Sequence, residues 1–289
     1  EFCSIMDSGL KKQVDSLPPS GVQLVAIDLD GTLLDSHKEL PDGAADLFAR
    51  ARRAGVRLSI FTGRNVCSVN ELARILRLSG PHVSSGGSLI SGNGGRPVYV
   101  RHGLSREETH QIVEVCRRWH LTIFFHGTSQ ILVENGDDVL PKLSVPYYPC
   151  PPQPRQDILA NLRFKPLKVT IYGPREAMQA ARLELAHCPS GFNMTTAGEE
   201  DIEVTPHGVN KGSALREVSA ITGIPLAHVM VIGDSPNDLP MFAEAGLAVA
   251  MANALPEVKQ AAARIAPSHN EAGVLWAIQN LALSPKAIL

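Results

Sequence analysis

The chain has 289 residues, of which 44% are hydrophobic and 19% are charged, and its formal net charge at pH 7 is −2. This composition is ordinary for a globular protein and suffices for one large domain, or for one medium domain with a smaller insert. It provides no basic surface for nucleic acid or for an anionic membrane, and no apolar run reaches the roughly 18 residues of a membrane span. We therefore expect neither nucleic acid nor a membrane as a partner, and the sequence leaves the oligomeric state open.

The cysteines bear on the cellular compartment. They are odd in number, widely spaced and without a CxxC pair: Cys3, Cys67, Cys116, Cys150 and Cys188. This spacing is typical of reduced thiols and not of a disulfide framework or a zinc site. The first 21 residues also lack the apolar segment of a secretory signal. These features predict a cytoplasmic protein.

The first predicted strand is the apolar run VQLVAIDLD at residues 22–30, which delivers Asp28 to its carboxyl end. Apolar spacing and turn residues then predict further elements: a helix at 42–54, a strand at 56–61, a helix at 65–78 and a strand at 81–85. Alternation of strands and helices predicts a parallel sheet covered by helices on its faces.

The pattern changes after residue 86. Asn93-Gly94 is a hairpin signal between two short apolar runs. The elements predicted beyond it are a helix at 105–119, strands at 121–127 and 129–135, a proline-rich loop at 141–154, a strand at 167–173, a helix at 174–187, and strands near 191–196 and 201–205. This mixture predicts an independent α+β lobe inserted into the first domain.

The α/β alternation resumes at residue 210. It predicts helices at 210–223, 235–245, 256–263 and 271–281, with strands at 228–234 and 246–251. The predicted organisation is an N-terminal extension (1–21), a core in two parts (22–86 and 207–289) and an inserted cap (87–206). We expect the core to be a three-layer α/β/α sandwich with a mostly parallel sheet.

Asp28 and Asp30 lie two residues apart at a strand end, where open α/β sheets bind their ligands. A carboxylate there can attack phosphorus and hold it as an acyl phosphate. The second acid can protonate the leaving oxygen and later deprotonate water. Taken alone, the Asp30-Gly31 pair also fits a simple turn at the end of a strand.

Two further sites can bind an anion. The Thr62 hydroxyl and the backbone N–H groups near Gly63 follow another predicted strand and can bind phosphoryl oxygens. Lys211 opens a predicted helix, where its charge and the helix N-terminus both favour an anion. Each has an ordinary alternative, a helix N-cap for Thr62 and a solvated surface charge for Lys211.

The stretch VMVIGDSPNDLPMF at residues 229–242 is the most specific motif. Asp234 ends its apolar strand, and Asn237 and Asp238 lie in the first helical turn that follows. Mg²⁺ prefers oxygen ligands and keeps some of its waters. Asp28, Asp234 and the backbone carbonyl of Asp30 can supply three such ligands.

Four motifs occur together along the chain: DLDGTLLDS, SIFTGR, GVNKG and GDSPNDLPMFAEAG. Their order and approximate spacing resemble those of the haloacid dehalogenase superfamily. The downstream segments AVAMANALPEVKQAA and SHNEAGV resemble its Cof-type subgroup, subfamily IIB, whose C2B-type cap lies between the second and third motifs. The resemblance implies a Rossmann-like core with an inserted α+β cap.

The resemblance also implies roles for the matched residues. Asp28 would be the nucleophile and Asp30 the general acid and base. The metal ligands for Mg²⁺ would be Asp28, Asp30 and Asp234. The residues that would bind or support the phosphoryl group are Thr62, Gly63, Arg64, Lys211, Asn237 and, in a supporting role, Asp238.

We therefore expect an Mg²⁺-dependent phosphomonoester hydrolase that acts on a small phosphorylated metabolite through an aspartyl-phosphate intermediate. A sugar phosphate is favoured, and pyridoxal phosphate and FMN also fit. One alternative is a sugar phosphomutase, which would use the same Asp28 and Asp30 and would be activated by a sugar bisphosphate. Another is a non-catalytic ligand-binding protein of the same fold. His126, near the end of a predicted cap strand, is in a position to contact substrate, but the interpretation we favour is a strand-edge or surface histidine.

Overall fold

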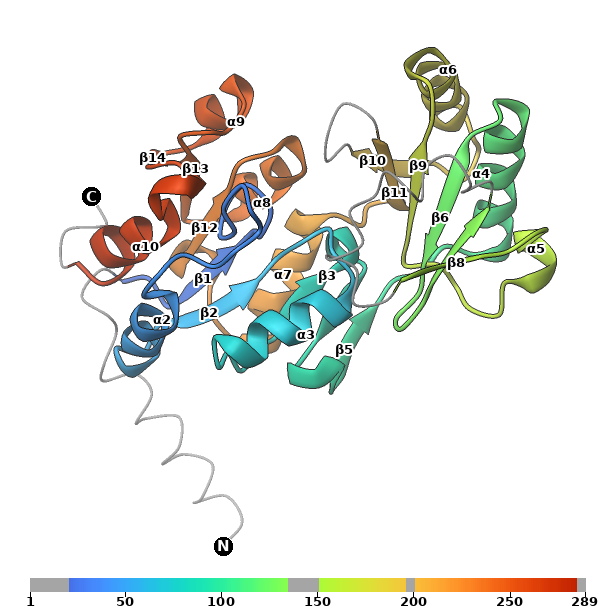
Figure 1. The fold of residues 1–289 in the computed structure, drawn as a ribbon. Helices are drawn as coiled ribbons and strands as arrows, with labels where there is room; N and C mark the ends of the chain where they lie inside the picture. Colours follow the sequence, from blue (N-terminus) through green and yellow to red (C-terminus); the bar gives the residue numbers. More distant parts are fainter. Residues whose placement is uncertain (1–20, 135–150, 196–200, 285–289) are drawn as a thin grey trace, which may run out of the picture.

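The computed structural model describes residues 21–134, 151–195 and 201–284. Figure 1 shows two lobes side by side, each built around its own β-sheet. The predicted N-terminal extension, apart from its last residue, and residues 141–150 of the predicted proline-rich loop lie outside the described residues.

The first lobe is built on a parallel sheet of five strands in the order β14-β13-β12-β1-β2. Its strands are β1 Leu24–Ile27, β2 Arg57–Ile60, β12 Val229–Gly233, β13 Leu247–Met251 and β14 Arg264–Ala266. The central strands β1 and β12 are buried over their whole length, as expected where helices cover both faces of a parallel sheet.

Two layers of helices cover this sheet. Along β1, Val25 and Ile27 pack into one apolar cluster, whereas Leu24 and Ala26 pack into the other. The helices of the first cluster are α2 Ala44–Arg53, α3 Val66–Ile75 and α10 Gly273–Ala277. Those of the second are α7 Lys211–Thr222, α8 Leu239–Glu244 and α9 Pro256–Ala261. The predicted three-layer sandwich is confirmed.

A small antiparallel sheet adjoins β2. Its strands are β3 His82–Ser84, β4 Leu89–Ser91 and β5 Val98–Arg101, so the predicted hairpin around Asn93-Gly94 is present. Val83 and Ile90 pack with Phe61 in one of the core clusters. The sequence predicts that the cap starts at residue 87. Because the hairpin packs on the core, we propose instead that the cap begins after residue 101.

The second lobe is the cap, a six-stranded sheet in the order β10-β11-β9-β6-β7-β8. Its strands are β6 Thr122–His126, β7 Ile131–Glu134, β8 Pro152–Pro154, β9 Lys168–Tyr172, β10 Phe192–Thr195 and β11 Asp201–Pro206. One face is apolar and is covered by α4 Arg106–Arg118, α5 Ile158–Asn161 and α6 Arg175–Ala186. Figure 1 places these helices on the side of the cap away from the core. The inserted α+β cap is thus confirmed.

Short helical turns complete the described elements: η1 Ser85–Gly87, η2 Asn93–Gly95, η5 Leu226–His228, η6 Pro236–Asp238, η7 His269–Glu271 and the π-helical η8 Ile278–Ala282. The sequence predicts one continuous helix at 271–281, but η7, α10 and η8 divide this segment. Ala272 has φ 53°, a left-handed conformation that ends η7 before α10 begins. The sequence also predicts a loop at 152–154, where Pro152 and Pro154 lie in the edge strand β8.

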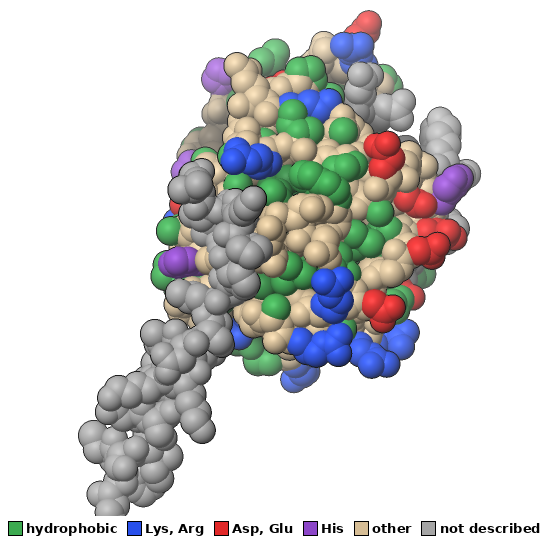
Figure 2. All heavy atoms as spheres, turned by 90° about the vertical axis from the view of Figure 1, so that its left-hand side faces the viewer, with side chains coloured by type: hydrophobic (Ala, Val, Ile, Leu, Met, Phe, Trp, Pro, Cys, Tyr) green, Lys and Arg blue, Asp and Glu red, His purple; other side chains and the backbone are tan. Residues whose placement is uncertain are grey.

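Surface chemistry and cysteines complete the description. Figure 2 shows the end of the molecule remote from the cap, where hydrophobic side chains lie among both basic and acidic ones. Among the described residues, no helix combines the length and the hydrophobicity that a membrane span requires.

Cys116 and Cys188 are free thiols, whereas Cys67 is disulfide-bonded. The expectation that every cysteine is a reduced thiol is therefore wrong at Cys67.

Candidate active site

Strand register brings two acidic side chains together at the carboxyl edge of the core sheet. Asp28 follows β1 and Asp234 follows β12, and Ile27 lies beside Ile232 on these parallel neighbours. The backbone N–H of Asp28 donates to the Ile232 carbonyl oxygen at 3.0 Å, which extends the ladder by one residue. Asp28 and Asp234 therefore meet where the sequence predicts.

Lys211 lies against these acids as the first residue of α7. The Asn210 side chain caps this helix by accepting hydrogen bonds from the N–H groups of Gly212 and Ser213. Lys211 is only 1% exposed, and its Nζ donates to Asp28 Oδ1 at 2.7 Å and to Asp238 Oδ1 at 2.6 Å. Although burial alone lowers the pKa of Lys211, these two carboxylates outweigh it and raise the pKa. Lys211 is thus a buried, charged group and not a solvated one.

Asp238 holds the loop after β12 in place. It is fully buried in η6, and its Oδ2 accepts the backbone N–H groups of Asp234 at 3.0 Å and of Ser235 at 3.1 Å. A Cβ atom on Gly233 would overlap the Asp238 carboxylate, so this approach requires glycine. Asp238 therefore orients both Lys211 and the backbone that carries Asp234.

A divalent cation fits the acidic cluster at this edge. Carboxylate oxygens of Asp28, Asp234 and Asp238 lie within 4.8 Å of one another. Burial raises the pKa of Asp28 well above its ordinary value despite the opposing charge of Lys211, and Asp238 and Asp234 add to the rise. Burial, together with the charge of Asp238, raises the pKa of Asp234 to about 6. The cluster sets three carboxyl groups against the one ammonium of Lys211, and hard oxygen donors suit Mg²⁺.

The members of this cluster are not equally available to a cation. Asp238 already accepts three hydrogen bonds, whereas Asp234 Oδ1 accepts one from the Thr32 hydroxyl at 2.9 Å. The Asp30 carboxylate lies outside the cluster, which is consistent with the expectation that Asp30 offers its backbone carbonyl to the metal. Asp28 and Asp234 are the side chains best placed to bind the cation.

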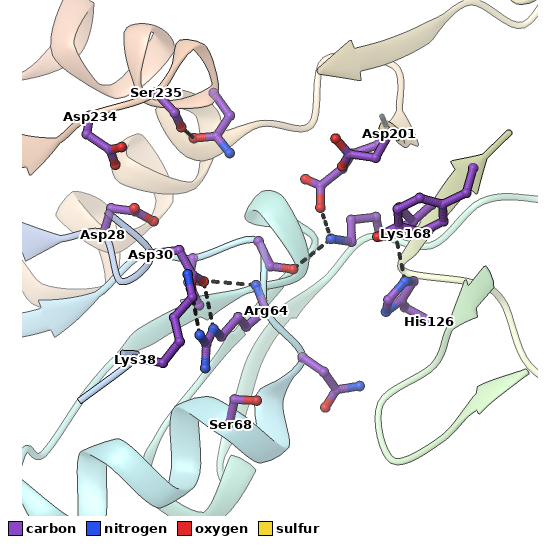
Figure 3. A pocket seen from close by; sticks show the side chains of 17 residues that line it. Asp28, Asp30, Lys38, Arg64, Ser68, His126, Lys168, Asp201, Asp234 and Ser235 are labelled. Atoms are coloured by element: carbon purple, nitrogen blue, oxygen red, sulfur yellow. Dashed lines mark hydrogen bonds and ion pairs between the residues drawn. The ribbon is translucent and has the colours of Figure 1, made fainter. Parts of the chain in front are cut away.

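The Asp30 carboxylate is instead paired with two cations. The Arg64 guanidinium donates to both of its oxygens at 2.6 Å, and Lys38 Nζ donates to Oδ1 at 2.8 Å (Figure 3). Burial alone would raise the pKa of Asp30, but hydrogen bonds and charges from Arg64 and Lys38 outweigh it and lower the pKa to about 2. In this arrangement Asp30 is ionised.

The loop after β2 carries the next group of predicted residues. Thr62 is 1% exposed, and its hydroxyl oxygen accepts the Arg64 backbone N–H at 3.1 Å, which leaves the hydroxyl proton available to an anion. The carbonyl of Gly63 accepts Lys168 Nζ from the cap at 2.8 Å. On the opposite side of the site, Ser235 Oγ donates to Asn237 Oδ1 at 2.9 Å.

These residues line a cavity of about 310 Å³ between core and cap. Its core wall contains the predicted residues Asp28, Asp30, Thr62, Gly63, Arg64, Asp234 and Asn237, and Lys211 and Asp238 lie behind Asp28. Its cap wall is formed by His126, Lys168, Thr170, Tyr172, Asp201 and Glu203. Such a volume is at the small end of metabolite pockets.

Sequence reasoning does not predict the cap wall or Lys38. His126 is 5% exposed and lines the cavity, so the interpretation as a strand-edge or surface histidine is wrong. The available signal was alternation in LKVTIYG, where the polar Lys168 and Thr170 alternate with the apolar Val169 and Ile171. A polar face on a strand whose other face is buried indicates that it meets either solvent or a site. No comparable pattern marks Lys38.

Comparison with known proteins agrees with this geometry. Residues 25–278 match the family of haloacid dehalogenase-like hydrolases. A 5-amino-6-(5-phospho-D-ribitylamino)uracil phosphatase of Bacillus subtilis is 31% identical over 263 residues, which cover 91% of this chain and 96% of that protein. An HMP-PP phosphatase of Serratia proteamaculans is 30% identical over 246 residues, with 82% of this chain and 86% of that protein covered.

Solved structures agree as well. A haloacid dehalogenase-like hydrolase from Bacteroides thetaiotaomicron has a TM-score of 0.81 and 28% sequence identity, and the match covers 89% of this chain and 98% of that one. The chain therefore belongs to the haloacid dehalogenase-like hydrolases, and the resemblance to the Cof-type subgroup is confirmed. Its fold, its site and its relatives define it as a phosphatase.

Proposed function

We propose that this phosphatase hydrolyses a small phosphomonoester with Mg²⁺ and forms an aspartyl-phosphate intermediate on Asp28. One observation carries the proposal: the convergence of Asp28, Lys211 and Asp234 beside a cavity of about 310 Å³. The cluster joins a carboxylate nucleophile, a fixed cation and a second carboxylate suited to a metal.

Asp28 attacks phosphorus through one carboxylate oxygen. Lys211 favours the ionised, nucleophilic form of Asp28, because its ammonium compensates the charge that burial disfavours. The Thr62 hydroxyl, backbone N–H groups at Gly63, the Asn237 amide and Lys211 bind the oxygens of the transferring phosphoryl group. Asp238 positions Lys211 and the loop that carries Asp234.

Asp30 protonates the leaving oxygen and then deprotonates the water that attacks the intermediate. Its present pairing with Arg64 and Lys38 holds it ionised, so its role as an acid requires that it separate from these cations. Arg64 is then available to the bound substrate. The metal would be held by Asp28, Asp234 and the Asp30 carbonyl oxygen, and it would neutralise charge on the phosphoryl oxygens.

We propose a sugar phosphate or a sugar-alcohol phosphate as the substrate. The cavity suits a small metabolite, and one relative is named for a phospho-ribityl substrate. Pyridoxal phosphate and FMN fit the same chemistry. A sugar phosphomutase remains the alternative within this fold, and activation by a sugar bisphosphate would identify it.

We keep the cytoplasm as the proposed location, because Cys116 and Cys188 are free thiols. The disulfide at Cys67 argues against this location. Maleimide labelling in intact cells followed by mass spectrometry tests the location. A cytoplasmic protein carries a labelled Cys67, whereas a disulfide-bonded Cys67 is not labelled.

The test is phosphate release from a panel of phosphorylated metabolites with Mg²⁺ and with EDTA. The panel contains hexose, pentose and sugar-alcohol phosphates, pyridoxal phosphate, FMN, nucleotides and p-nitrophenyl phosphate. We expect release from a few members that EDTA abolishes and added Mg²⁺ restores. Equal release in EDTA would contradict the metal, and silence across the panel by folded protein would reject the hydrolase.

A further inference from the structure

Part of the cap-sheet face that meets the core is polar and buried, and it lies beside an apolar part formed by Phe124, Ile131, Val133 and Tyr172. Along β9, Val169 and Ile171 pack beneath the cap helices, so Lys168 and Thr170 point to the opposite face. Along β11, Ile202 and Val204 pack in the same way, so Glu203 points toward the core. Figure 3 shows Lys168 and His126 across the cavity from Asp28 and Asp30.

Along β6, Ile123 and Phe125 pack beneath the cap helices, so His126 shares the core-facing side with Lys168, Thr170 and Glu203, and the four side chains form two linked pairs. Lys168 forms an ion pair with Glu203, and His126 Nε2 lies 2.9 Å from Thr170 Oγ1. Strand register joins the pairs, because His126 lies beside Lys168 and Glu203 lies beside Thr170. We call these four residues the cap quartet.

The cap quartet has hydrogen-bonding capacity that the fold does not use. Each member is less than a tenth exposed, and His126 Nδ1 is buried without a hydrogen-bond partner. Such a group is costly to bury unless something binds to it. Burial and the nearby Lys168 lower the pKa of His126 well below its ordinary value, so its ring is neutral.

The charge of the cap quartet also restricts its ligand. The ion pair and the neutral imidazole leave it without net charge, and Asp201 lies beside it on the same wall. The cavity as a whole is lined by five carboxylates and three cations. A second phosphate or a carboxylate on the substrate would therefore meet Glu203 and Asp201 without an unpaired cation on this wall.

We propose that the cap quartet is the specificity subsite for the leaving group, that it binds hydroxyl groups of a neutral polyol, and that it rejects leaving groups with a second anionic group. A hydroxyl both donates and accepts, so it can donate to Glu203 and accept from Lys168 or Thr170. This inference rests on the proposed function, since it concerns the substrate of the same site.

The test compares kcat/KM for glucitol 6-phosphate, fructose 1,6-bisphosphate and p-nitrophenyl phosphate in the presence of Mg²⁺. We expect the wild-type protein to prefer glucitol 6-phosphate over the bisphosphate by at least about tenfold, the value of one well-placed polar contact. A preference for the bisphosphate would overturn the proposal.

Two variants locate the selectivity in the cap quartet. Thr170→Val keeps the side-chain shape but removes the hydroxyl, and it should lower the ratio of glucitol phosphate to aryl phosphate turnover by about tenfold. Glu203→Gln leaves Lys168 without its anion and should shift preference toward the bisphosphate by a similar factor. The matched control is Glu114→Gln, an exposed carboxylate on α4 on the other side of the cap sheet. Variants whose ratios equal those of this control would also overturn the proposal.

A binding measurement separates this inference from the proposed function. Calorimetric titration of Asp28→Asn with glucitol 6-phosphate and with fructose 1,6-bisphosphate, with Mg²⁺ present, detects the subsite without turnover. Preferential binding of glucitol 6-phosphate that Thr170→Val weakens supports the inference, even if the wild-type protein hydrolyses none of the panel. Equal or weaker binding of glucitol 6-phosphate rejects it, even if the protein is an active phosphatase.

Discussion

Lys211 connects two buried carboxylates through one ammonium group. Its Nζ lies 2.7 Å from Asp28 and 2.6 Å from Asp238, and all three side chains are almost fully buried. Removing the cation leaves two uncompensated charges in a region of low polarity. A buried ion pair contributes little net stability, but breaking it from one side is costly.

We therefore predict that Lys211→Met lowers the free energy of unfolding by about 3–5 kcal/mol at pH 7. The double variant Lys211→Met/Asp28→Asn should recover part of this loss, because one unpaired carboxylate is neutralised. Urea unfolding of the wild type, both single variants and the double variant measures the coupling. Strictly additive effects would show that the contact between Lys211 and Asp28 has no energetic consequence.

His82 gives the fold a dependence on acid. The side chain is buried, its Nδ1 accepts the Ile60 backbone N–H at 3.2 Å, and its Nε2 lies 3.2 Å from Asn93 Oδ1. Burial lowers the pKa of His82 to about 4 from the ordinary 6.5, while Asn93 partly opposes the shift. Between these values the unfolded chain binds the proton and the folded chain does not, so stability falls as the pH falls from 6.5 toward 4.

We predict that the wild type loses about 2–3 kcal/mol more than His82→Gln between pH 7.5 and pH 4.5. Urea unfolding of both proteins across this range provides the measurement. Parallel pH profiles would show that His82 is not the responsible group.

At the scale of elements, side chains next to the first turn of a helix determine where that helix begins. Ser105 precedes α4, its side chain accepts the Glu108 N–H at 3.1 Å, and the Glu108 carboxylate accepts the Ser105 N–H at 2.6 Å. This capping box satisfies two of the N–H groups that a helix leaves unpaired at its start. The helix predicted at 105–119 is therefore observed with nearly the same bounds.

We predict that Ser105→Ala lowers the free energy of unfolding by about 1 kcal/mol. The control Ser36→Ala, at an exposed position in a turn, should change it by less than about 0.5 kcal/mol. Thermal and urea unfolding of the two variants make the comparison. Equal effects on the free energy of unfolding would mean that the capping box at Ser105 contributes no specific stability.

Other elements carry no comparable signal. In β14, Arg264 and Ile265 are exposed and only Ala266 is buried, so this short edge strand lacks the apolar run that marks β1 or β12. In β8, prolines occupy an edge position that sequence patterns treat as loop. Both strands depend on pairing with a neighbour, β13 for β14 and β7 for β8, which single-strand patterns do not contain.

The dependence on pairing between strands also explains why one wall of the site can be predicted from the sequence and the other cannot. Its core wall is predictable, because parallel strands end at one edge and carry Asp28, Thr62 and Asp234 to it. The cap quartet is not, because its members meet through antiparallel register between residues as distant as His126 and Glu203. Alternation marks each strand, but it does not tell which face meets the core.

At the scale of the whole molecule, two hydrogen bonds join the loop after β2 to the cap. Asn65 Nδ2 donates to the Gly127 carbonyl at 3.1 Å, and Lys168 Nζ donates to the Gly63 carbonyl at 2.8 Å. Asn65 also caps α3, since its Oδ1 accepts the Cys67 N–H at 2.8 Å. The loop that carries Thr62 is thus held by the lobe that covers the cavity.

We predict that Asn65→Ser raises KM for the preferred substrate by about five- to tenfold, through loss of one hydrogen bond between the lobes. Serine keeps a good N-cap for α3, so the fold should persist. Steady-state kinetics, with thermal unfolding as the check on folding, measure this effect. An unchanged KM would show that this contact does not hold the loop and the cap together in the working enzyme.

The most direct test of the central claim is acid quenching of the reaction during turnover with Mg²⁺ and a preferred phosphomonoester, followed by peptide mass spectrometry. We predict a phosphoryl group on Asp28 in the wild type. It should be absent from Asp28→Asn, whose phosphate release should fall by at least about a thousandfold, while the matched surface variant Asp42→Asn behaves as wild type. Rapid phosphate release by Asp28→Asn, or turnover with the phosphoryl group on another residue, would contradict the account.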